Sequence, residues 1–162
     1  MKKTSLLVIG AILGSAISLQ AQVERVAMRT TGISCGVCAA VSEVYLRQLG
    51  GVDKIKISLS QEAIMVSYKP GAAFRPRDIR DALKKTDVGV TQFQISARGQ
   101  VQQQNDKRLF VTGKDVFILV QSSDPLVPIV PADSPVVLEG ILNDQTSPMK
   151  LKVLTVTPIA KK

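Results

Sequence analysis

Apolar residues recur along the chain with two periods, and each change of period predicts a new element. Alternation of apolar and polar residues is typical of half-buried strands, whereas apolar residues three and four positions apart are typical of an amphipathic helix. In the first helix we take Val41, Val44, Tyr45 and Leu49 as the apolar face, and Gly50 follows its end. In chain order the pattern predicts a strand over residues 23–30, a helix over 36–49, strands over 54–59 and 64–68, a short helix from 76, and a strand over 93–97.

The resulting order, βαββαβ, predicts an α+β fold with the split βαβ arrangement of ferredoxin-like domains. We assign this domain to residues 23–99. The polar, Gln-rich stretch 100–106 has little to bury, so we expect a linker or an exposed loop there. Residues 107–158 are rich in Val, Leu, Ile and Pro and predict a small all-β module of four strands, similar in pattern to barrels of the OB type. With about 50 residues this module has little core of its own, and we expect it to pack on the first domain or on a partner.

The start of the chain has the pattern of an export signal. Residues 1–3 form a short, positively charged segment, and residues 6–19 are mostly apolar. Ala21 is a small residue after which a signal peptidase could cut. We therefore expect residues 1–21 to be a removed signal peptide and the mature protein to be periplasmic or secreted. An uncleaved membrane anchor is the alternative, because Leu19 is larger than the usual residue three positions before a cut.

The composition describes a moderately basic protein. The chain has 21 basic and 13 acidic residues, a formal net charge of +8, and neither His nor Trp. This charge favours acidic partners or contact with an anionic membrane surface. It does not favour nucleic acid, because the basic residues are spread out and no aromatic pair lies beside them. Without His, and without a carboxylate pair at a recognisable spacing, the sequence offers no catalytic constellation, and we expect no enzymatic activity.

The two cysteines of the chain, Cys35 and Cys38, lie where the first strand gives way to the first helix. Two sulfurs three positions apart can bind an ion linearly, which suits Cu(I) or Hg(II) better than a closed, four-ligand zinc site. The helix N-terminus should lower the pKa of these thiols and stabilise the thiolates. No other soft ligand is near in sequence, so a tetrahedral site would need ligands from a partner or a second copy.

Other roles for these sulfur atoms stay open at this stage. In an exported protein the cysteine pair could be oxidised to a disulfide, which would be reducible and suited to regulation. A thioredoxin-like redox role has less support, because that fold has a different order of elements. Met28 and Met65 could act as thioether ligands, but both lie in strand patterns, where core packing is the simpler expectation.

The cysteine motif and the residues behind it match the pattern of a known family. The motif is Gly-x-Ser-Cys-x-x-Cys, directly after the first strand. Behind it, four residues stand at the distances at which the family ends its first helix and enters its second strand: Leu46, Leu49, Gly51 and Val52. On these features residues 23–98 resemble the heavy-metal-associated domain, the fold of copper chaperones, of the N-terminal modules of copper-exporting ATPases and of the periplasmic mercury-binding protein. The resemblance implies that Cys35 and Cys38 are the metal ligands.

The chain departs from the family pattern around the metal loop. Ile33 stands where the family usually has Met, and an apolar residue of similar size should keep the packing beneath the loop. Ser34 stands where copper and mercury modules usually carry Thr and zinc modules often carry Asp, which favours Cu(I) or Hg(II). The loop 84–90 lacks the Gly-aromatic pair that is usual in the family. Within this loop, Lys85 is the candidate residue to offset the negative charge of an ion bound by two thiolates.

The sequence therefore predicts an exported Cu(I) carrier, chaperone or scavenger of the bacterial envelope. A Hg(II) scavenger would use the same ligands. The resemblance implies a copper-transporting ATPase or another metal-accepting protein as partner, with the protein acting as a monomer or as a metal-bridged dimer. The alternative from a different class is a non-catalytic adaptor, whose β module binds a protein or membrane partner.

Overall fold

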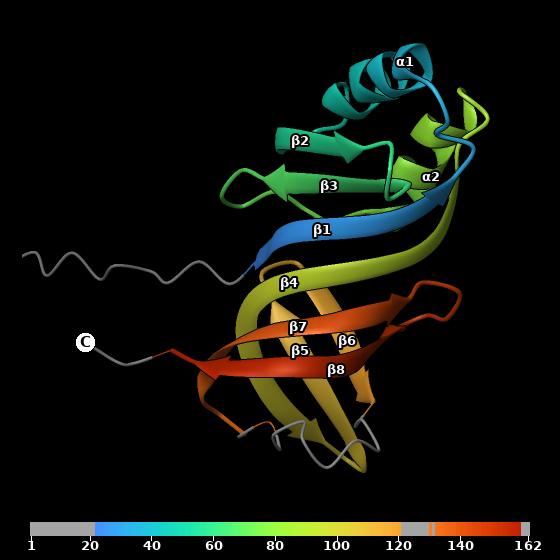
Figure 1. Cartoon of the computed structure of the whole chain (residues 1–162). Helices are drawn as coiled ribbons and strands as arrows, with labels where there is room; N and C mark the ends of the chain where they lie inside the picture. The colour runs from blue at the N-terminus through green and yellow to red at the C-terminus, as the bar shows by residue number, and fades with distance from the viewer. Residues whose placement is uncertain (1–21, 121–129, 131, 160–162) are drawn as a thin grey trace, which may run out of the picture.

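The computed structural model describes residues 22–120, 130 and 132–159 (Figure 1). The predicted signal peptide, residues 1–21, lies outside these described residues. The elements in chain order are β1 (Gln22–Thr31), α1 (Gly36–Arg47), β2 (Val52–Ser58), β3 (Ala63–Tyr68), α2 (Pro76–Lys84), β4 (Gly89–Gln104), β5 (Lys107–Thr112), β6 (Asp115–Val120), β7 (Pro135–Asn143) and β8 (Met149–Pro158). Within the described residues, no helix is both long and apolar enough to cross a membrane.

The first half of the described chain has the predicted βαββαβ order. Its strands form an antiparallel sheet in the order β2–β3–β1–β4. Alternate residues along these strands, such as Val26, Val66 and Ile95, are fully buried, which is the pattern of strands with one face on a core. Leu46 of α1 and Leu83 of α2 belong to the same buried cluster, so both helices cover this one face. The α+β prediction for this half is confirmed.

Helix α1 packs on the core through part of its predicted face only, because Tyr45 and Leu49 contact the core and Val41 and Val44 do not. Ser42 and Leu46 are fully buried, whereas Val41 and Val44 are 41% and 56% exposed, so the predicted apolar face is wrong for these two valines. The Oγ atom of Ser42 lies 2.9 Å from the Oγ1 atom of Thr86, beyond the end of α2. This hydrogen bond satisfies a hydroxyl that would otherwise be costly to bury. The bond is possible only because α1 and α2 lie side by side.

Strand β4 joins the two halves of the molecule, and it replaces most of the predicted linker at 100–106. Residues 100–104 form the end of this 16-residue strand and pair with β5. Val101 is fully buried, while Gln100 and Gln102 on either side are exposed, which is the alternation of a half-buried strand. The Gln-rich composition hides this alternation, because only one side of the strand contacts the core.

The described strands β4 to β8 close into a barrel. Antiparallel pairs join β4 to β5, β5 to β6, β8 to β7 and β7 back to β4, and a parallel pair joins β6 to β8. The four strands predicted over 107–158 are present as β5 to β8, but closure needs β4 as a further strand. Fully buried Phe110, Phe117, Leu138 and Leu151 fill the interior.

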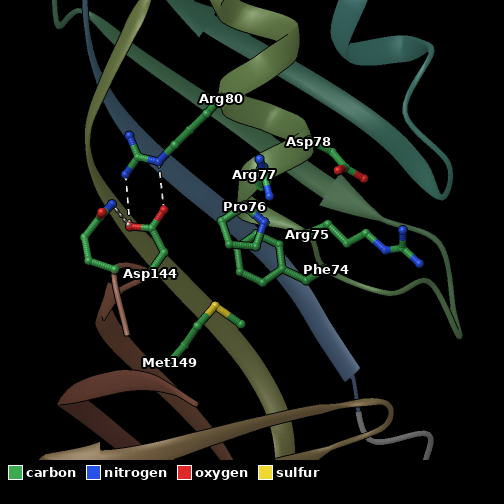
Figure 2. Close-up of a pocket in the computed structure, with 9 residues that line it drawn as sticks. Phe74, Arg75, Pro76, Arg77, Asp78, Arg80, Asp144 and Met149 are labelled. Carbon is green, nitrogen blue, oxygen red and sulfur yellow. Dashed lines mark hydrogen bonds and ion pairs between the residues drawn. The ribbon is translucent and has the colours of Figure 1, made fainter. Parts of the chain in front are cut away.

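Contacts away from β4 also hold the halves together. Arg80 of α2 donates to both carboxylate oxygens of Asp144, in the connection between β7 and β8, at 2.7 and 3.0 Å (Figure 2). The same guanidinium donates to the carbonyl oxygen of Val90 at 2.6 Å and lies 4.8 Å from the centre of the Phe93 ring. A single cluster of buried side chains runs through both halves. The halves therefore pack as one unit around a shared strand.

Candidate metal-binding site

The two cysteines meet at the N-terminus of α1. Cys35 is the exposed N-cap residue, with φ of −140° and ψ of 155°, and its Sγ atom accepts a hydrogen bond from the backbone N–H of Cys38 at 3.0 Å. The carbonyl oxygen of Cys35 accepts from the N–H of Ala39 at 3.0 Å, as the first bond of the helix. Sulfur thus takes the position that a Ser or Asp oxygen usually takes at a helix start. An electron-rich sulfur at this position is stabilised by an N–H that would otherwise lack a partner.

The loop that carries Cys35 is supported from beneath and from one side. Ile33 is fully buried under it, so the predicted packing of this residue is confirmed. Gly32 has a φ of +88°, and a Cβ atom there would lie 2.6 Å from the carbonyl oxygen of Asp87. Only glycine fits both the backbone angle and the approach. The loop therefore lies against the turn that precedes β4, and Cys35 at its end is exposed.

The structure joins Cys35 and Cys38 as a disulfide, with their Cα atoms 5.2 Å apart. This is the oxidised state that the sequence left open beside metal binding. Metal binding and the disulfide use the same two sulfurs and exclude each other, because the metal ligand is a thiolate and a disulfide contains none. Across residues 22–120, 130 and 132–159, no group of three or more His, Cys, Asp or Glu side chains could hold a metal ion. Any ion at this loop would bind through the cysteine pair.

The two predicted supporting residues lie in different places. Ser34 is exposed beside Cys35. Lys85, at the C-cap of α2, holds its Nζ atom 4.9 Å from the centre of the Tyr45 ring. Tyr45 lies about 10 Å farther along α1 than Cys38, at 1.5 Å per residue. In this structure Lys85 therefore contacts the distal part of α1 and not the cysteine loop.

Sequence reasoning missed the contact of Asp87 with the metal loop. Asp87 has a positive φ of 55°, a conformation that Asp and Asn tolerate better than most residues. Its carbonyl group faces Gly32 across the loop, a contact between segments more than fifty positions apart. The sequence Asp87-Val88-Gly89 predicts a turn, but it does not predict which residues the turn contacts.

The surface of α1 beside the sulfurs is apolar, and the first helical turn has no acidic residue. Val37, between the two cysteines, is 73% exposed, and the exposed Val41 and Val44 continue along the same side of α1. The first turn of α1 has no acidic residue, so no carboxylate opposes the negative charge of a thiolate there. A partner that reaches the sulfurs would meet this apolar rim first.

Three titratable groups have shifted pKa values: Tyr68 and Asp115 lie toward the end of the first sheet opposite the cysteine loop, whereas Asp144 pairs with Arg80 beside Val90. Burial is the main cause that raises the pKa of the Tyr68 hydroxyl and the pKa of the Asp115 carboxyl. The hydrogen bond from Arg80 is the main cause that lowers the pKa of Asp144. A cavity of about 540 Å³ lies beside the Arg80–Asp144 pair, at the N-terminus of α2 (Figure 2). These groups stabilise the junction between the halves and take no part in the cysteine site.

Comparison with known proteins points to the same half of the chain. No protein-family model matches. The chain is 38% identical over 84 residues to human copper-transporting ATPase 2, and 38% identical over 64 residues to the mouse protein of that name. The chain contains a domain that resembles the heavy-metal-associated domain. The match covers 52% of this chain and 5% of the human protein, so the chain spans a small part of that relative.

Solved structures with similarity to the chain include a metallochaperone and a domain of a potential copper-translocating ATPase. The CopZ metallochaperone is 22% identical, with a TM-score of 0.38, over 41% of this chain and 98% of that one. The N-terminal domain of a potential copper-translocating P-type ATPase from Bacillus subtilis, in its Cu(I)-loaded state, is 25% identical, with a TM-score of 0.38, over 43% of this chain and 85% of that one.

Proposed function

We propose that the reduced protein binds one Cu(I) ion between the Sγ atoms of Cys35 and Cys38, and that it acts as a carrier or scavenger of that ion. The observation that carries the proposal is the pair of sulfurs at the start of α1: exposed Cys35 caps the helix and accepts the N–H of half-buried Cys38 in its first turn. The 38% identity to copper-transporting ATPase 2 supports copper as the metal.

The geometry suits delivery as well as binding. Two thiolates give a soft, two-coordinate site, which Cu(I) accepts and which leaves the ion open to further sulfur ligands. A thiolate of the acceptor protein can therefore bind the ion before either cysteine dissociates from it. The ion then passes through three-coordinate states and is not released to solvent. The exposed position of Cys35 and the apolar surface of Val37 beside it leave room for that approach.

We infer that this function is performed outside the cytoplasm, because residues 1–21 have the pattern of a signal peptide. A copper-transporting ATPase or another metal-accepting protein would then be the partner. The order of strands β4 to β8 and their one parallel pair fit an OB-type barrel, for which we propose a supporting, non-catalytic role. If the protein is instead an adaptor, a variant without both cysteines should keep its function.

Titration of the reduced mature chain tests metal binding. Anaerobic protein should withdraw one equivalent of Cu(I) from a coloured chelator, and Cys35→Ser and Cys38→Ser should each abolish that competition. Thr157→Ala is the control, because it removes an exposed hydroxyl in β8 and leaves the cysteine loop unchanged. A Cys35→Ser protein that competes as well as the parent would overturn the assignment. A parallel titration with Hg(II) decides which of the two ions binds more tightly.

A further inference from the structure

The sheet has a second face, which the helices do not cover. Pairings β2–β3, β3–β1, β1–β4, β4–β7 and β7–β8 form a continuous antiparallel sheet across both halves. Residues directly opposite one another on paired strands point to the same face. One such row crosses the sheet outside the core: Lys56, Met65, Ala27, Gln94, Ile141 and Lys152. The row beside it holds Lys54, Ser67, Arg25, Ser96, Glu139 and Thr155.

Exposed cations gather at one part of this face. We define the basic patch as Arg25 and Arg29 of β1 with Lys54 and Lys56 of β2, all of them exposed. The two strands are separated by β3 alone, so the cations lie within about 10 Å across the sheet, at 4.8 Å per strand. Within the two rows, Glu139 is the single acid, and it pairs with Arg25 at 3.4 Å in an exposed contact of little strength. The patch therefore keeps most of its positive charge.

The side chains between these cations are small, polar or aliphatic. Met65 lies at the centre of the basic patch and is 36% exposed, opposite both Lys56 and Ala27. Neither row contains an aromatic residue on which a nucleic-acid base could stack. A few neighbouring basic residues around one exposed apolar side chain, without a stacking platform, match the chemistry of an anionic lipid surface.

We propose that the basic patch docks the protein on a membrane surface rich in anionic lipid headgroups. The net charge supports the approach, because it attracts the whole molecule to such a surface: it is +8 for the full chain and +6 without Lys2 and Lys3 of the expected signal peptide. The sheet twists by about 20–25° per strand, so a planar surface meets β1, β2 and β3 and turns away from β8. The helices lie on the opposite face, and docking leaves α1 and its cysteines free. Membrane docking is therefore independent of metal binding.

Sedimentation with lipid vesicles tests this proposal on the mature chain. The protein should sediment with vesicles of phosphatidylcholine mixed with phosphatidylglycerol, should remain in solution with phosphatidylcholine alone, and should be released as salt is raised. Lys54→Gln with Lys56→Gln should weaken the binding at least tenfold. The control is Lys84→Gln with Lys114→Gln, which removes the same charge from exposed positions on α2 and on the β5–β6 turn and should bind nearly as the parent does.

Further arms separate this proposal from its alternatives. The protein with both cysteines changed to Ser should sediment as the parent does, so a failure of metal binding leaves the docking result intact. Equal binding by the patch variant and the control variant would overturn the proposal, and so would equal binding to vesicles with and without phosphatidylglycerol. Tighter binding to a single-stranded oligonucleotide than to vesicles, lost with the same two lysines, would assign the patch to nucleic acid instead. Circular dichroism of each variant checks that it is folded.

Discussion

Replacing Gly99 by Ala tests whether the two halves depend on one strand. Gly99 lies in β4, opposite Val136 of β7 and just before the pairing of β4 with β5 begins. A Cβ atom added there would overlap the carbonyl oxygen of Val111 and lie 2.9 Å from two ring carbons of Phe110. Neither neighbour can yield easily, because one is backbone of a paired strand and the other is a fully buried ring.

The expected cost follows from those contacts. Overpacking a filled interior costs about 1–3 kcal/mol, and an overlap with fixed backbone belongs at the upper end of that range. Removing a glycine also restricts the unfolded chain, which returns about 0.4–1 kcal/mol. We therefore expect Gly99→Ala to lower the free energy of unfolding by about 2–3 kcal/mol. Gly50→Ala is the control, because no heavy atom lies within 4 Å of its added Cβ.

Urea unfolding followed by two probes measures this effect. Tyrosine fluorescence reports the first half, because Tyr45 and Tyr68 are the only tyrosines in the chain and no tryptophan is present. Far-ultraviolet circular dichroism reports both halves. A shared strand predicts that both transitions coincide and move together in Gly99→Ala. If the circular dichroism transition moves and the tyrosine transition stays, the halves fold independently and the reasoning from the shared strand is refuted.

Three other substitutions test local claims. Asp144→Asn should lower the free energy of unfolding by about 1–2 kcal/mol near neutral pH. Because the pKa of Asp144 is lowered in the folded protein, the stability from its ion pair is present above the pKa of an unfolded Asp and is lost as the pH falls through the folded value. Parent and variant should therefore be equally stable in acid, and a difference that persists there would contradict the ion-pair explanation. Cys35→Ala should be about 1 kcal/mol less stable than Cys35→Ser, because the serine hydroxyl can accept the hydrogen bond at the N-cap of α1 and alanine cannot. Thermal melting with reductant present measures the difference, and equal melting temperatures would refute the capping role. Gly32→Ala should displace the loop from Asp87 and lower the affinity for Cu(I), measured by competition with a chelator, at least tenfold. An unchanged affinity would contradict the requirement for glycine at this position.

The features that sequence predicts well are local in the chain. The order βαββαβ follows from the period of apolar residues and from the glycines that end elements, and both signals lie within a few residues of what they specify. The cysteine motif is local in the same sense, because Cys35 caps the turn that contains Cys38. The order of elements was confirmed, because each segment carries its own evidence, while the cysteine site stays a prediction.

The errors concern contacts between distant segments. In α1, apolar residues lie on two sides, and the partner of Ser42, which is Thr86 in the turn after α2, shows which side is buried. Composition made 100–104 resemble a linker, but burial of Val101 depends on strands that come later in the chain. The role of Lys85 stays a prediction; its Nζ atom lies 4.9 Å from the centre of the Tyr45 ring, a contact between distant segments that the sequence does not show.

The continuity of β4 gives the barrel a structural role at the metal loop. Thr31, the last residue of β1 before the loop, pairs with Gly89, the first residue of β4. The turn just before Gly89 carries the Asp87 carbonyl that faces Gly32. The far end of the same strand is fixed by β5 and β7 in the barrel. Over residues 93–98, β4 pairs with β1 on one side and β7 on the other, so it cannot slide without breaking both ladders, and a slip of one residue would turn its buried side chains outward. The barrel therefore restrains the position of the loop through β4, without contacting the cysteines.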